Sequence, residues 1–144
     1  MKRKRIKEES EITKALYEVE ISAEATLYPC EDYDKVVKVL YNVIDGELVK
    51  ETVNNRTVLK VVSKDKKQIY RIFNHFRRRR VLATLRAHLM KYLTNDAIVI
   101  PLHKQAAYAG VLSICDIGDS PLGEVIVRIK VKEPQKIVEY FTRF

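Results

Sequence analysis

Four consecutive arginines, Arg77–Arg80, form the group of side chains best suited to a specific chemistry. They lie within residues 64–91, which hold ten of the chain's 27 basic residues and one acidic residue, Asp65. A guanidinium group makes planar, two-pronged contacts with phosphate and stacks on bases. Clustered positive charge also attracts a polyanion. The pattern therefore favours nucleic acid as the partner, with an anionic membrane surface or a solvated helix without a partner as the alternatives.

Two further features extend this candidate site. Lys104 lies at the end of a predicted strand and is a candidate phosphate ligand, and Tyr108 is a candidate platform for a stacked base. The alternative is a simple connection between two strands, with Tyr108 in the core. The predicted nucleic-acid-binding residues are Arg77, Arg78, Arg79, Arg80, Arg86, Lys104 and Tyr108, and their charge does not distinguish RNA from DNA.

Residues that would support catalysis or metal binding lack the required spacing. His75, His88 and His103 are scattered, and the chain contains neither Cys-x-x-Cys nor His-Glu-x-x-His. Ser120 lacks the Gly-x-Ser-x-Gly pattern of a nucleophile elbow. Cys30 precedes a predicted helix, where a thiol pKa can fall, but we interpret it as a small, partly buried residue. We expect no catalytic residue, no metal and no cofactor.

Composition excludes several classes of protein. The chain has 144 residues, a net charge of +8 and two cysteines. It has no apolar run of about 18 residues, so it spans no membrane, and its cysteines are too few for a disulfide framework. Residues 1–7 carry five basic side chains with no apolar stretch behind them, unlike a secretory signal peptide. We expect a cytoplasmic protein with no membrane partner.

The length predicts one domain preceded by a tail. Residues 1–14 are interpreted as a basic, flexible tail, because apolar periodicity begins only after Lys14. Basic arms of this kind often order only on nucleic acid. Residues 15–144 then form a single α+β domain.

Hydrophobic periodicity predicts the strands that position these residues. Strict alternation of apolar and polar side chains indicates a half-buried strand. Asn54-Asn55 tolerates the positive φ of a tight hairpin, and Pro101 suggests an edge strand or an early end. The predicted strands are residues 17–27, 47–53, 56–63, 97–102, 107–115 and 125–131.

Helices are predicted between and after these strands. Glu31 and Asp32 favour the N-terminus of the first helix, which Gly46 closes. Asp65 is a candidate cap for the helix that follows the hairpin. Pro134 suits the first turn of the last helix.

A helix break is predicted at the arginines. The first apolar stripe is Ile69, Ile72, Phe73 and Phe76, and the second is Leu82, Leu85 and Leu89. The two stripes lie roughly half a turn apart around the helix axis. One continuous helix would force an arginine into the core, which is costly. We therefore predict two helices with a break at Arg77–Arg80.

The predicted order is strand-helix-strand-strand-helix-helix-strand-strand-strand-helix. Consecutive strands joined by short turns pair in the antiparallel sense. The fold class is α+β, with helices packed on a mostly antiparallel sheet. An exposed edge of such a sheet also offers self-pairing, so a homo-oligomer formed through an edge strand is an open alternative.

Three late segments resemble an archaeal family catalogued as predicted RNA-binding or exosome-associated proteins. They are His103–Gly110, Asp119–Gly123 and Lys132–Lys136, and the similarity covers nearly the whole chain after residue 15. The resemblance implies a fold similar to that of the ribosomal protein that binds 5S ribosomal RNA. Lys104, Gln105 and Tyr108 match the family motif.

The leading hypothesis is a non-catalytic RNA-binding protein, associated through the resemblance with RNA processing or the exosome. Its arginines and Lys104 would contact phosphates, Tyr108 would stack on a base, and the tail would add salt-sensitive affinity. One alternative is a protein-interaction module of a larger complex. Another is an enzyme acting on a small anionic substrate.

Overall fold

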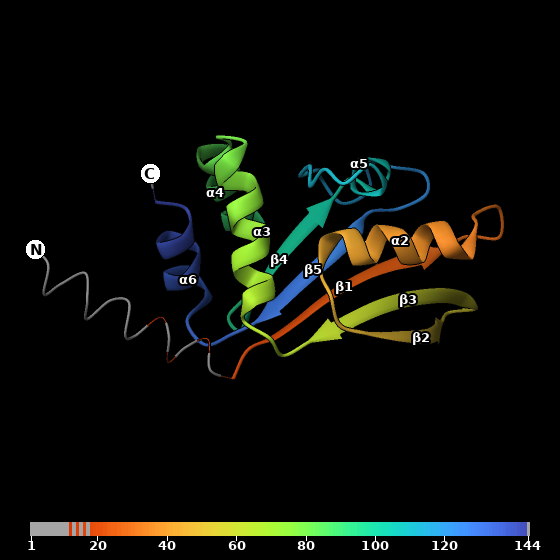
Figure 1. Cartoon of the computed structure of the whole chain (residues 1–144), viewed down its shortest axis with the longest axis horizontal. Helices are drawn as coiled ribbons and strands as arrows, with labels where there is room; N and C mark the ends of the chain where they lie inside the picture. Colours follow the sequence, from red (N-terminus) through yellow and green to blue (C-terminus); the bar gives the residue numbers. More distant parts are fainter. Residues whose placement is uncertain (1–11, 13, 15, 17, 144) are drawn as a thin grey trace, which may run out of the picture.

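The computed structural model describes residues 12, 14, 16 and 18–143. Within these residues, a five-stranded antiparallel sheet carries five helices (Figure 1). The strands are β1 (Glu20–Leu27), β2 (Glu47–Val53), β3 (Arg56–Ser63), β4 (Ala97–Leu102) and β5 (Val125–Lys130). The helices are α2 (Tyr33–Val43), α3 (Lys67–Arg78), α4 (Leu82–Tyr92), α5 (Lys104–Tyr108) and α6 (Pro134–Phe141). The predicted α+β class is confirmed.

β1 lies at the centre of the sheet, whose strand order is β2-β3-β1-β5-β4. Ala23 of β1 pairs with Val61 of β3 and Val127 of β5, and Val127 pairs in turn with Ile100 of β4. All four side chains are buried and share one face. α2 contacts β1 and β3, whereas α4 and α6 contact β4, so the helices cover both halves of the sheet (Figure 1).

The predicted hairpin and the predicted edge strand are confirmed. β2 and β3 pair around Asn54 and Asn55, whose φ angles of 50° and 63° lie in the left-handed region. Asparagine reaches this region more readily than most residues. Among the described strands, β4 pairs with β5 alone and therefore forms one edge of the sheet, with Pro101 opposite Ile126.

The predicted strand at residues 107–115 is wrong. The structure forms α5 at Lys104–Tyr108, and only Ile114 of this segment pairs with a strand, through an isolated bridge to Leu102. The His103 side chain caps α5, since its Nδ1 accepts the N–H of Ala106 at 3.3 Å. A local cap and tertiary contacts thus override a weak strand pattern.

Two predicted element ends also shift. β1 begins at Glu20, because Glu18 lies in a turn. α2 ends at Val43, so Gly46 does not close it. Gly46 has another role: a Cβ there would lie 2.3 Å from the backbone oxygen of Val62, so only glycine permits this close approach.

Most of the predicted tail lies outside the described residues. Of residues 1–14, the structure describes Ile12 and Lys14. Ile12 is 5% exposed and belongs to the core, as does Leu16. Apolar side chains preceding the sheet therefore contribute to its core.

Candidate nucleic-acid interface

α3 and α4 meet at a corner within the arginine run. Arg79 is the C-cap of α3, and Arg80 has a φ of 58°. This left-handed conformation costs a non-glycine residue roughly 1–2 kcal/mol. It lets α3 bury Phe76 and α4 bury Leu82 while all of Arg77–Arg80 stay exposed. The predicted break is confirmed; we call Arg77–Arg80 together with Arg86 the arginine corner.

Two arginines tie this corner to the rest of the molecule. Arg77 Nη2 donates to the backbone oxygen of Phe141, the last residue of α6, at 3.1 Å. Arg79 Nη1 donates to the backbone oxygen of Leu112 at 2.7 Å, in the segment that follows α5. A guanidinium has five N–H donors, so each of these side chains keeps donors for a ligand. The contacts hold the corner in a fixed orientation.

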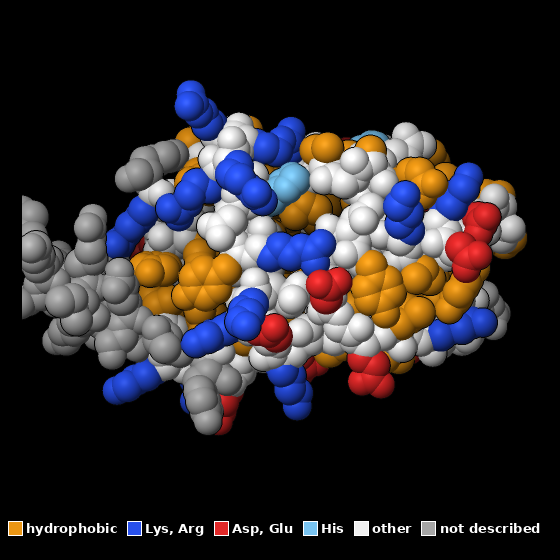
Figure 2. Space-filling model, in the orientation of Figure 1, with side chains coloured by type: hydrophobic (Ala, Val, Ile, Leu, Met, Phe, Trp, Pro, Cys, Tyr) orange, Lys and Arg blue, Asp and Glu red, His pale blue; other side chains and the backbone are white. Residues whose placement is uncertain are grey.

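The other three arginines point into solvent. Arg78, Arg80 and Arg86 are exposed, and none of their guanidinium groups makes a hydrogen bond or ion pair with the part of the chain that the structure describes. Figure 2 shows Lys and Arg side chains gathered over α3 and α4. Free guanidinium groups next to tethered ones form a surface that can take up phosphates of an extended polyanion.

His75 lies between this corner and the segment after α5. Its Nε2 accepts the backbone N–H of Leu112 at 3.0 Å. Burial lowers the pKa of His75 from its ordinary value of 6.5, and the charges of Arg79, Arg78 and Arg71 lower it further. The ring is therefore a neutral acceptor at neutral pH. Part of this lowering of the pKa comes from the positive charge of the arginine corner.

Lys104 is buried, contrary to the expectation of an accessible phosphate ligand. Its side chain is 7% exposed. Its Nζ donates to the backbone oxygens of Thr26 at 2.8 Å and Leu122 at 2.9 Å, and it forms an ion pair with Glu31 Oε1 at 2.8 Å. An ammonium group has three protons, and all three are used inside the protein. Lys104 is thus a structural residue that joins α5, β1 and the N-terminal side of α2.

Tyr108 lies at the surface, so its predicted alternative placement in the core is wrong. It ends α5 and is 39% exposed. Lys38 Nζ lies 4.8 Å from the centre of its ring. Asn42 Nδ2 donates to the backbone oxygens of Ala107 at 2.9 Å and Tyr108 at 3.2 Å, which fixes α5 against α2. The backbone at Tyr108 is therefore fixed, and its ring remains accessible.

A short segment joins Tyr108 to the arginine corner. Val111 N–H bonds to the backbone oxygen of Ala106, which folds residues 109–111 back on α5. The next residue, Leu112, bonds to both Arg79 and His75. Tyr108 is thus four residues away in sequence from Leu112, which bonds to Arg79 of the arginine corner. Lys104, by contrast, lies in the interior.

Sequence reasoning missed the residues of α2 that lie near Tyr108. Lys35 and Lys38 are exposed and one turn apart on α2. Their spacing of three placed them on one side of a predicted helix. Nothing in the local sequence, however, indicated that α2 lies next to α5. A hydrogen bond that joins the two helices links Asn42 to Ala107, which are 65 positions apart.

The candidate nucleophiles and metal ligands do not form a reactive group. Cys30 is exposed, not partly buried as predicted. Burial, with the nearby acidic side chains, raises the pKa of Cys115 to about 11, which disfavours the reactive thiolate. In the described portion of the chain, no three His, Cys, Asp or Glu side chains come together as a metal site. In the same portion, no helix is long and apolar enough to cross a bilayer.

A family model described as RNA binding matches residues 20–132, which include the five strands given above and the arginine corner. The chain belongs to this RNA-binding family. Its relatives include the UPF0201 protein of Pyrococcus abyssi, which is 36% identical over 128 residues, covering 88% of this chain and 90% of the relative. The UPF0201 protein of Sulfurisphaera tokodaii is 33% identical over 133 residues, covering 91% and 88%. The archaeal family predicted from the sequence motifs is confirmed.

Two solved structures have the same fold as this chain. The crystal structure of the UPF0201 protein from Methanococcus jannaschii superposes with a TM-score of 0.71 at 25% identity, covering 87% of this chain and 94% of that one. A DUF54 protein from Methanothermobacter thermautotrophicus gives 0.63 at 22% identity, covering 85% and 91%. The α+β architecture is thus shared by proteins that differ widely in sequence.

Proposed function

We propose that this protein binds RNA without catalysing a reaction, and that the arginine corner contacts the phosphates. The observation that carries the proposal is the set of three exposed guanidinium groups, Arg78, Arg80 and Arg86, none with a partner within the described residues. The description of the family model supports RNA as the polyanion. Electrostatic contacts of this kind give affinity without reading sequence.

The geometry of the corner supports a phosphate-binding role over a purely solubilising one. Arg80 is held in a left-handed conformation, and Arg77 and Arg79 are tied to backbone oxygens of neighbouring elements. Cations fixed in this way lose less conformational entropy when they bind than flexible lysines do. Because Lys104 is engaged with Glu31, we exclude it from the interface and keep Tyr108 as the base-stacking candidate.

The experiment is a titration of fluorescently labelled single-stranded RNA and duplex RNA over a salt series. If about four phosphates of a single strand are neutralised, the logarithm of the affinity should fall with the logarithm of the salt concentration at a slope near −3. A variant with Arg77–Arg80 all changed to Ala should lose most of the affinity and of the slope. Its cooperative melting has to be verified first.

A matched variant removes equal charge from the other end of α3 and from β2. Its changes are Lys50→Ala, Lys64→Ala, Lys66→Ala and Lys67→Ala, and all four lysines are exposed. This variant should bind RNA nearly as wild type does. Equal losses in the two variants would mean that affinity follows net charge and not the corner, and an absence of wild-type binding at near-physiological salt would contradict RNA binding itself.

A second candidate function is a protein-interaction module within RNA-processing machinery such as the exosome. It is favoured by the sheet face opposite Ala23 and Val61, which carries the half-buried side chains Val49, Val58, Val62, Val99 and Ile126. An ion pair between Glu24 and Arg128 crosses this face. Here the partner protein, or a second copy pairing through an edge strand, would bind with little response to salt or to loss of the arginines.

A further inference from the structure

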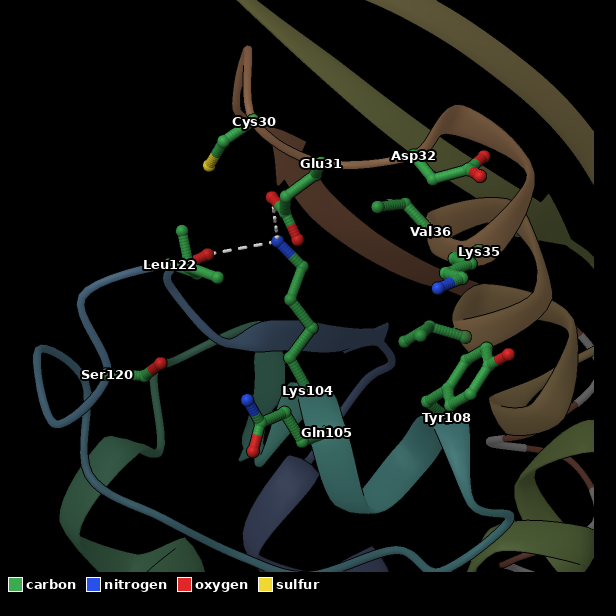
Figure 3. A pocket seen from close by; sticks show the side chains of 11 residues that line it. Cys30, Glu31, Asp32, Lys35, Val36, Lys104, Gln105, Tyr108, Ser120 and Leu122 are labelled. Atoms are coloured by element: carbon green, nitrogen blue, oxygen red, sulfur yellow. Dashed lines mark hydrogen bonds and ion pairs between the residues drawn. The ribbon is translucent and has the colours of Figure 1, made fainter.

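A pocket of about 450 Å³ opens between α2, α5 and the turn that contains Ser120 and Leu122. This volume lies within the range of roughly 300–1,000 Å³ typical of small-ligand sites. Figure 3 shows Lys104 rising from α5 toward Glu31 and Leu122. Tyr108 and Lys35 lie on one side of it and Ser120 lies on the other. The pocket is therefore built from three parts of the chain that the fold brings together.

The charges inside the pocket balance, which disfavours a phosphate as its occupant. Lys104 is neutralised by Glu31 and has no donor left, because Thr26 and Leu122 take its remaining protons. The other two charged residues of the lining, Asp32 and Lys35, are of opposite sign. A phosphate placed here would meet two carboxylates without a free cation beyond Lys35. An uncharged ligand avoids this repulsion.

The walls suit a flat aromatic ring. Tyr108 offers an accessible ring, and Val36, Val39 and Leu122 supply apolar surface. Nucleobases stack on aromatic side chains irrespective of their sequence, since every base has a π-face. Lys38, which does not line the pocket, lies 4.8 Å from the ring centre of Tyr108 and so places a cation just outside it. A base inside the pocket would have its phosphate near this lysine.

Polar groups are available for the edge of such a base. Gln105 offers both a donor and an acceptor, and Ser120 offers a hydroxyl. The hydrogen bonds that Glu31 makes with Tyr28 N and Lys104 both use Oε1. Its second oxygen thus keeps lone pairs for an amino or imino group. An apolar cavity with a few convergent polar groups is the usual form of a small-ligand site.

We propose that this pocket holds one unpaired base of the bound RNA, stacked on Tyr108. The inference rests on the proposed function and specifies it: the strand contacts the arginine corner with its phosphates and inserts a single base beside α5. The segment that ends at Leu112 links the two sites, since Leu112 bonds directly to Arg79 and His75. Duplex RNA has no free base to insert, so the pocket selects single-stranded over paired RNA.

The test compares Tyr108→Ala with Tyr108→Phe on a labelled single-stranded RNA of eight nucleotides and on a duplex of the same sequence. Tyr108→Ala should weaken single-strand binding by roughly tenfold or more, as expected for loss of one stacked base. Tyr108→Phe keeps the ring and should keep the affinity. Duplex binding should be unchanged in both variants.

Tyr33→Ala is the matched control. Tyr33 is an equally accessible tyrosine of α2, 42% exposed, that does not line the pocket, and its removal should leave RNA binding unchanged. If Tyr108→Ala binds the single strand as wild type does, or loses single-strand and duplex binding equally, the base pocket is wrong. The Arg77–Arg80 variant then still tests the proposed function. A wild-type protein that binds neither the single strand nor the duplex overturns both the base pocket and the proposed RNA binding.

Discussion

His75 is the residue through which the charge of the arginine corner affects stability. Its Nε2 accepts the N–H of Leu112, so this nitrogen has to be unprotonated. Burial, and then repulsion from Arg79, Arg78 and Arg71, lowers the pKa of His75 below its ordinary value of 6.5. The folded protein therefore binds this proton less readily than the unfolded chain, in which the ring is exposed to water.

The lowered pKa predicts a loss of stability in mild acid. The contribution of His75 is fully present above pH 6.5 and is lost as the pH falls from there toward the folded-state pKa. The free energy of unfolding, measured with urea at several pH values, should fall more steeply over this window in wild type than in His75→Gln. His88→Gln controls for the loss of a histidine. Identical pH profiles for wild type and His75→Gln would assign the acid sensitivity to other groups.

A substitution at Lys104 tests whether this residue stabilises the fold or contacts RNA directly. Lys104→Met keeps the side-chain stem but leaves the Glu31 carboxylate, 13% exposed, without its cation. Breaking a buried ion pair by removing one partner costs about 3–5 kcal/mol. We expect this loss in the free energy of unfolding measured with denaturant. The salt slope of RNA binding, measured at a temperature where the variant is folded, should not change.

A second variant tests the cause of that loss. Glu31→Gln combined with Lys104→Met removes both charges, and it should recover part of the stability that Lys104→Met loses. If instead Lys104→Met folds as stably as wild type and binds RNA with a shallower salt slope, Lys104 is a phosphate ligand, as its sequence motif suggested.

At the scale of elements, the patterns that depend on neighbouring residues were predictable. The hairpin followed from Asn54-Asn55, whose backbone has the left-handed φ that asparagine tolerates. The corner between α3 and α4 followed from two apolar stripes that no single helix could bury. The break was thus forced by burial of Phe76 and Leu85 together with exposure of the arginines between them.

Elements whose stability comes from distant contacts were not predictable in the same way. α5 has five residues and a cap from His103, and its backbone oxygens accept hydrogen bonds from Asn42. So short a helix is marginal without tertiary contacts. Residues 107–115 therefore resembled a strand in isolation. The same limit applies to Lys104, whose acceptors on Thr26 and Glu31 are 78 and 73 positions away.

The candidate site was predictable only in part for this reason. The arginine run is a local feature of composition, and burial of an arginine is costly in any fold, so its exposure could be expected. Whether Tyr108 faces solvent or the core depends on how α5 docks on α2, which involves Asn42. The pocket beside it depends in addition on the turn at Ser120 and Leu122. These contacts follow only from the three-dimensional fold.

The whole molecule combines a strongly basic sequence with an unequal distribution of charge. Residues 64–91 carry ten basic side chains and one acidic, whereas the pocket beside Tyr108 contains two charges of each sign. The two regions are joined through Leu112. In the proposed binding mode, a single RNA strand meets a salt-sensitive site for its backbone at the arginine corner and a salt-insensitive site for one base in the pocket. Salt should weaken the first contribution and spare the second.

Deletions at the N-terminus test which residues contribute to RNA affinity and which contribute to the stability of the domain. Residues 1–7 carry five basic side chains, whereas Ile12 and Leu16 are buried in the core at 5% and 1% exposure. Deleting residues 1–7 should leave the unfolding free energy unchanged. It should reduce RNA affinity at low salt and flatten the salt slope by about 0.7 for each phosphate of a single strand that the tail neutralises in the full-length protein.

A longer deletion, of residues 1–16, should also destabilise the domain. It removes Ile12 and Leu16, and loss of one such buried side chain typically costs about 2–5 kcal/mol. Denaturant unfolding and RNA titration of both deletions, beside the full chain, separate the two effects. The shorter deletion should keep the tenfold effect of Tyr108→Ala, because the base pocket lies entirely in residues 30–122. A chain lacking residues 1–16 that unfolds like wild type would contradict the packing of Ile12 and Leu16 in the core.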